Sequence, residues 1–225
     1  MRTFSRLGML LSLAWLLGPA PAFAIDAADD ISESLRQLGA IDSADQPNSA
    51  AAAWKQVAEA DVRQLPRVLA AIDTEHPLAA NWLRSAADAM VERAIAEGQP
   101  LPLDELEQFI SQTEHGPRAR RLAFELLREV EPKRAESLIP AMLQDPSVEL
   151  RRESVALRMA EAEQYQQSGE RDSAITAYRQ ALDGARDEDQ VKQIAESLRG
   201  LDQELDLPRH FGFIQSWQMI APFDN

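Results

Sequence analysis

Hydrophobic residues recur with the period of an α-helix along most of the chain, most clearly from Pro132 to Ala162. Asp145-Pro146 divides this stretch into two helices, because the residue before a proline is disfavoured in the α conformation. Ser147 or Asp145 can cap the second helix. One stripe of the first helix, spaced i, i+3, i+4, i+7 and i+8, contains Ala135, Leu138, Ile139, Met142 and Leu143. The predicted apolar face of the second helix contains Val148, Val155, Ala156, Met159 and Ala162.

The same periodicity predicts further helices on both sides of this pair. A proline near the start (Pro66, Pro77, Pro117) or a glycine after the end (Gly98, Gly169) marks several of them. Asp172 or Ser173 is the expected cap of the helix after Gly169. Because no single amphipathic helix can bury its own stripe, neighbouring pairs must stack. We therefore predict an all-α fold, a right-handed α-solenoid of antiparallel helix pairs, with a short β-like segment at the C-terminus.

The last residues, 206–225, follow another pattern. Phe213, Gln215, Trp217 and Met219 alternate with Ile214, Ser216, Gln218 and Ile220, and the segment is rich in aromatic residues. Alternation with period two is typical of a β-strand. We expect an extended aromatic tail that is the possible start of a β-domain.

The N-terminal residues 1–24 have the pattern of a secretory signal peptide. Arg2 and Arg6 precede an apolar stretch that is too short to span a bilayer, and Ala22 and Ala24 form the small-x-small cleavage site. Cleavage after Ala24 predicts a periplasmic or extracellular protein, whose first segment, residues 25–48, is an acidic lead-in and linker. The chain has no cysteine, which excludes a lipoprotein attachment site, disulfides and thiolate metal ligands.

Composition and charge narrow the classes of partner. Hydrophobic residues make up 45% of the chain but aromatic residues only 6%, which favours closely packed helices over a β-sandwich. The formal charge is −14, and removal of Arg2 and Arg6 with the signal peptide makes it −16. Such acidity argues against a nucleic acid, or an anionic membrane surface after signal cleavage, as the main partner.

Three helix–turn–helix units resemble HEAT repeats, best seen in LIPAMLQDPSVELRRESVALRMAEA. The resemblance covers about Val62 to Ala162, and we expect the domain of HEAT-like helical repeats to span residues 49–162. It implies a hydrogen-bonded ladder between neighbouring units, made by an Asp at the turn and an Arg six residues later, here Asp145 and Arg151. Glu114 and Arg120 have the same spacing, whereas the first unit departs from the pattern, with Ala79 at this offset from Asp73.

Two C-terminal stretches carry further resemblances. EAEQYQQSGERDSAITAYRQAL, within residues 163–205, is similar to a tetratricopeptide unit, although the terminal proline of that pattern is absent. DLPRHFGFIQSWQMIAPFDN resembles the opening strand of a galactose-binding-like β-sandwich. In large exported bacterial proteins such a strand can follow helical repeats. The resemblance therefore implies that the chain is the N-terminal part of a longer protein and that Trp217 would contact a glycan only if a β-domain follows.

No catalytic, cofactor-binding or metal-binding residues are predicted. The sequence lacks the nucleophile-elbow, zincin, Walker and dinucleotide-binding motifs. His76 and His115 each follow a glutamate, but no third ligand accompanies them, and equivalent positions in two repeats explain both. Acidic pairs such as Asp104 and Glu105 have the pattern of a solvated helix face.

The stretch from Gly116 to Arg158 has a local excess of positive charge, with nine basic and seven acidic residues. The interaction candidates are Arg118, Arg121, Arg152 and Trp217. The basic residues among them would contact an acidic partner or an anionic glycan. The alternative is that these arginines form ladders and ion pairs within the solenoid, such as Glu149 with Arg152.

The sequence thus predicts an exported helical-repeat scaffold or protein–protein interaction module with no catalytic site and no cofactor. Its protein partner is not identified by the sequence. The alternative function is an N-terminal helical arm of a larger exported enzyme or carbohydrate-binding protein, and the sequence beyond the aromatic tail distinguishes the two.

Overall fold

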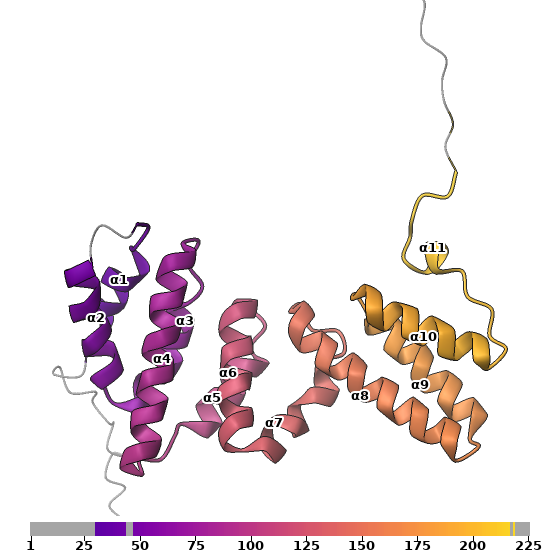
Figure 1. Ribbon diagram of the computed structural model, residues 1–225, viewed down its shortest axis with the longest axis horizontal. Coiled ribbons are helices and arrows are strands. Elements are labelled where there is room, and N and C mark those ends of the chain that lie inside the picture. Colours follow the sequence, from indigo (N-terminus) through magenta and orange to yellow (C-terminus); the bar gives the residue numbers. More distant parts are fainter. Residues whose placement is uncertain (1–29, 44–46, 217, 219–225) are drawn as a thin grey trace, which may run out of the picture. The chain divides into compact units, whose positions relative to one another are not determined.

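The computed structural model describes residues 30–43, 47–216 and 218, and all regular structure among them is helical (Figure 1). The predicted all-α class is confirmed for this part of the chain. Ala22, Ala24 and Trp217 lie outside the described residues, as does the whole of the expected signal peptide. No helix within the described residues has both the length and the apolar character needed to cross a bilayer.

The helices follow one another across short turns. The first four α-helices and a 3-10 turn are α1 (Ser32–Gly39), α2 (Pro47–Glu59), η2 (Val62–Gln64), α3 (Leu65–Ala71) and α4 (Pro77–Glu97). The middle of the chain contains α5 (Leu103–Ser111), α6 (Pro117–Val130), α7 (Pro132–Leu138) and η3 (Ile139–Met142). The last four are α8 (Val148–Gln167), α9 (Arg171–Gly184), α10 (Glu188–Gly200) and α11 (Leu207–His210).

Proline and glycine set several of these boundaries, as the sequence predicts. Pro77 and Pro117 are the first residues of α4 and α6, where a missing backbone N–H costs nothing. Gly98 and Gly169 end α4 and α8 with φ of 69° and 80°, a left-handed conformation that glycine adopts without strain. The expected cap of α9 is wrong: its N-cap is Glu170, so Asp172 lies inside the first turn.

The stretch from Pro132 to Ala162 differs from its prediction in two ways. The first helix changes from α7 into the 3-10 turn η3, which contains Pro140, because proline cannot donate the backbone hydrogen bond that an α-helix requires. In α8 the predicted burial of Val155, Met159 and Ala162 is confirmed, but the other two predicted residues are not buried. Val148 is 49% exposed and Ala156 is also exposed. The buried residues of α8 are Leu150, Ser154, Val155, Met159 and Ala162.

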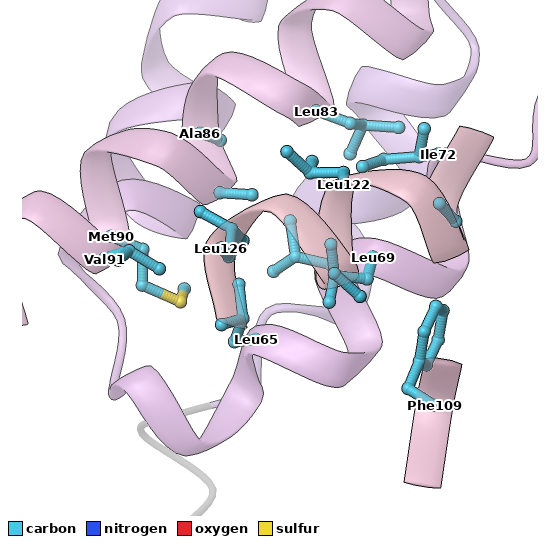
Figure 2. Packing of buried hydrophobic residues seen from close by; sticks show 14 of the residues in the cluster. Leu65, Leu69, Ile72, Leu83, Ala86, Met90, Val91, Phe109, Leu122 and Leu126 are labelled. Carbon is cyan, nitrogen blue, oxygen red and sulfur yellow. The ribbon is translucent and has the colours of Figure 1, made fainter. Parts of the chain in front are cut away.

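Buried side chains form two clusters. The first extends from Ile31 to Leu150 and contains the inner faces of α1 to α6. Figure 2 shows part of it, where Leu83 of α4, Leu122 of α6 and Ile72 at the end of α3 lie close together. The second cluster extends from Val155 to Leu201 and joins α8, α9 and α10. Helix α8 contributes to both clusters, with Leu150 in the first.

Large apolar side chains in two parts of the described chain are not fully buried. Trp54 and Trp82 are partly buried and pack against the first cluster. Residues 213–216 of the tail have no regular secondary structure, and the side chains of Phe213 and Ile214 are 67% and 71% exposed. The predicted strand is therefore not present in these described residues, and the rest of that prediction falls mainly on residues outside them.

Candidate protein-interaction face

A chain of ion pairs crosses from α4 over α6 to α8. Arg84 of α4 donates to Glu125 of α6 at 3.1 Å, and Arg121 donates to the other oxygen of Glu125 at 2.9 Å. Arg121 also donates to Glu153 of α8 at 2.9 Å, and Arg128 reaches the same Glu153 oxygen at 3.3 Å. These contacts tie three successive long helices together on one face.

Protonation in this network follows from burial and pairing. Partial burial acts to raise the pKa of Glu125, but the hydrogen bond and charge of Arg121 outweigh it and lower the pKa. Burial similarly opposes the charge of Arg121, whose hydrogen bonds to Glu125 and Glu153 nevertheless raise its pKa. Burial raises the pKa of Asp88, which lies one turn from Arg84 on α4. Arg121 is therefore engaged in ion pairs within the protein.

Arg152 is engaged in the same way. Its guanidinium donates to both carboxylate oxygens of Asp189, at 2.9 and 2.6 Å, and lies 3.0 Å from Asp187. The hydrogen bond from Arg152 lowers the pKa of Asp189 to about 2. The Gln190 side chain also donates to the backbone oxygen of Arg152 at 3.0 Å. Arg152 thus joins α8 to the start of α10.

The buried pair of this region is Arg120 with Asp145. Arg120 is 1% exposed, and its two terminal nitrogens donate to the Asp145 carboxylate at 2.8 and 2.6 Å. Its Nε donates to the backbone oxygen of Ile110 at 2.8 Å. The expected ladder contact between neighbouring units is made by Arg120 and the Asp145 carboxylate, whereas the Arg151 side chain donates to the Asp145 backbone oxygen at 2.7 Å. The carboxylate that precedes α8 thus pairs with an arginine of α6.

A hollow of about 320 Å³ lies where α4, α6 and α8 approach one another. Ile72, Ala80 and Leu122 line it and are themselves 4%, 7% and 3% exposed. Its charged lining residues are Arg84, Arg118, Arg121 and Glu149, and its remaining lining residues are Pro77 and Asn81. The hollow therefore combines an apolar floor with an excess of cationic side chains.

Arg118 differs from the other two arginines of the hollow. It is exposed at the second residue of α6, and no carboxylate of the described residues lies within 4.0 Å of its guanidinium. The nearby carboxylate of Asp73 packs on Gly116, where an added Cβ would stand 1.5 Å from the Asp73 Oδ1 atom. Among the interaction candidates that the structure describes, Arg118 retains a guanidinium free to pair with another molecule.

The histidines and acidic pairs have local roles. His115 stacks on Phe109 with ring centroids 3.9 Å apart, and one ring nitrogen lies 3.1 Å from the Gln112 side-chain oxygen. The backbone N–H of His76 donates to the Thr74 hydroxyl at 3.2 Å. Asp104 is paired with Arg134. Across the described ranges, no group of three or more His, Asp or Glu side chains is placed to hold a metal ion.

Sequence reasoning selected Arg118 and Arg121 but missed their neighbours in the hollow. Arg84 belongs to α4, outside the basic stretch from Gly116 to Arg158, and Glu149 belongs to α8. The equivalent turns of the repeats were the signal that could have brought these positions together. No protein-family model, curated protein or solved structure matches the chain.

Proposed function

We propose that this protein is an exported helical-repeat scaffold that binds a protein partner through the face formed by α4, α6 and α8. In this proposal residues 1–24 direct export, the helix pairs form a right-handed α-solenoid, and the chain needs neither a catalytic site nor a cofactor. The observation that carries it is the hollow on this face, in which Arg118 has no carboxylate partner among the described residues.

The ion pairs around the hollow support a binding role. Arg121 bridges Glu125 of its own helix and Glu153 of α8, with both contacts at 2.9 Å, so that the walls are held by side chains from different repeats. A site held in this way loses little conformational freedom when a partner binds, which favours affinity. The arrangement offers both charge and shape for the recognition of a partner.

Site-specific photo-crosslinking in the native source tests this function. A photoreactive residue at Asn81, which is exposed and lines the hollow, is compared with one at Glu105, which is exposed at the start of α5. We expect a single defined protein adduct from position 81, identified by mass spectrometry, and none from position 105. The absence of an adduct at 81, or identical adducts at both positions, would contradict the proposal.

A second candidate function is that of a helical arm in a larger exported enzyme or carbohydrate-binding protein. The exposure of Phe213 and Ile214, at 67% and 71%, favours it, because large apolar side chains in a tail are normally covered by another part of a protein. The intact mass of the protein from its native source separates the two candidates. A mass equal to residues 25–225 rejects the arm, and a much larger mass supports it.

A further inference from the structure

We infer that the hollow between α4 and α6 binds an acidic segment of the partner protein, with an apolar side chain on its floor and a flanking carboxylate on Arg118. This inference rests on the proposed function and adds the chemistry of the partner. The hollow, at about 320 Å³, is at the small end of the range of roughly 300–1,000 Å³ typical of ligand pockets. It can accept one or two side chains of a segment rather than a folded surface.

The floor of the hollow suits an apolar side chain. Ile72 and Leu122 are nearly buried by their own core, and Figure 2 shows their side chains close to Leu83 in that core. Their remaining surface faces a space that is already open, so an incoming leucine or valine would lose water contact without displacing a helix. Ala80, a small residue, leaves this space unfilled.

The rim of the hollow suits a carboxylate. The Arg118 guanidinium has no carboxylate partner within residues 30–43, 47–216 and 218, and the Arg84 side chain is 55% exposed although it lies 3.1 Å from Glu125. A guanidinium can bind both oxygens of a carboxylate, which gives direction as well as charge. Beyond a screening length of about 8 Å at physiological salt, the acidity of the rest of the chain has little influence on such a contact.

Glu149 makes it possible to test whether the bound segment is acidic. It lines the hollow from the first turn of α8 and is the acidic member of the lining. A bound carboxylate would be repelled by it, whereas an uncharged ligand would not. Removal of this charge in Glu149→Gln should therefore strengthen the binding of an acidic segment, which no general loss of structure would do.

The test is fluorescence anisotropy with the full chain and a labelled peptide of alternating glutamate and leucine at physiological salt. The control peptide has glutamine in place of glutamate. We expect only the acidic peptide to bind, Arg118→Glu to weaken it about tenfold or more, and Glu149→Gln to tighten it about threefold. Lys133→Glu is the matched control, since Lys133 is exposed at the second residue of α7, also directly after a proline.

Equal binding of the two peptides, or equal losses in Arg118→Glu and Lys133→Glu, would overturn the inference. Misfolding is not expected from Arg118→Glu, because an acidic residue in the first turn stabilises a helix, and the melting temperature checks this. Should the melting temperature fall, Arg118→Gln replaces it with the same expected direction. A crosslinked partner without acidic-peptide binding rejects only this inference. Arg118-dependent peptide binding without any crosslinked partner rejects the proposed function instead.

Discussion

At the scale of single residues, the arginines of α6 differ in whether their charge is paired within the protein or is available to a partner. Arg120 is buried with every terminal nitrogen bonded, Arg121 bridges two glutamates, and Arg118 lacks a carboxylate partner among the described residues. Three arginines within four positions of the sequence therefore have three different environments. Helical geometry causes this, since successive residues point about 100° apart around the axis.

The buried pair gives the first prediction. Arg120→Met should lower the free energy of unfolding by about 3–5 kcal/mol, because it leaves the carboxylate of Asp145 buried without its counter-charge. The control on the same helix is Arg128→Met, whose pair with Glu153 is 3.3 Å long and involves an arginine side chain that is 42% exposed. The control substitution should lower the free energy of unfolding by only about 0–1 kcal/mol. Urea unfolding followed by circular dichroism measures both, and equal losses would contradict a structural role for the Arg120 pair.

At the scale of elements, α9 is fixed against the turn before α8 by a close approach of backbone. An added Cβ on Gly184, the last residue of α9, would lie 2.8 Å from the backbone oxygen and 2.6 Å from the Cδ1 atom of Leu143. By contrast, Gly200 ends α10 with nothing within 4 Å of the equivalent position. The same substitution at two helix ends therefore has opposite expected effects.

Gly184→Ala should destabilise the protein by about 1–3 kcal/mol, because the backbone of Leu143 must move to admit the methyl group. Gly200→Ala should be neutral or stabilise by up to about 1 kcal/mol, since alanine restricts the unfolded chain more than glycine does. Thermal unfolding of the two variants beside the parent protein measures the difference. A stabilised Gly184→Ala would show that α9 does not pack on this turn as described.

The sequence predicted the ends of the helices better than it predicted which side of each helix is buried. The boundaries at Pro77, Gly98 and Gly169 depend on backbone chemistry within a few residues, so the sequence alone places them. The exposure of Val148 and the burial of Leu150 in the first turn of α8 depend instead on the packing of α8 against η3 and α9. Hydrophobic periodicity defines a helical stripe, but it does not decide which of two adjacent stripes a neighbour covers.

The candidate site was less predictable still, because its partners are distant in sequence. Asp145 is 25 residues from Arg120, Glu153 is 32 from Arg121, and Asp189 is 37 from Arg152. Charge counting identified the basic stretch but could not tell which arginines were already neutralised. Only the packing of successive helices leaves Arg118 beside an open hollow and closes the others into pairs.

At the scale of the whole molecule, the two hydrophobic clusters are connected mainly through α8. Its first turn supplies Leu150 to one cluster, and Val155, Met159 and Ala162 belong to the other. Arrays in which each unit touches only its neighbours gain stability from local interfaces and need not unfold in one step. We therefore expect the second cluster, from Val155 to Leu201, to unfold while the first remains intact.

The corresponding prediction uses Leu198→Ala and Leu127→Ala, which truncate fully buried leucines of the second and first clusters. Each substitution should lower the free energy of unfolding of its own cluster by about 2–5 kcal/mol. The two variants should therefore alter different unfolding transitions. In a Trp15→Phe, Trp217→Phe background, fluorescence from Trp54 and Trp82 follows the first cluster, while circular dichroism follows both. Leu198→Ala should shift the dichroism curve in urea and leave the fluorescence midpoint in place, whereas Leu127→Ala should move the fluorescence midpoint. Coincident transitions in both variants would show instead that α8 couples the clusters into one cooperative unit.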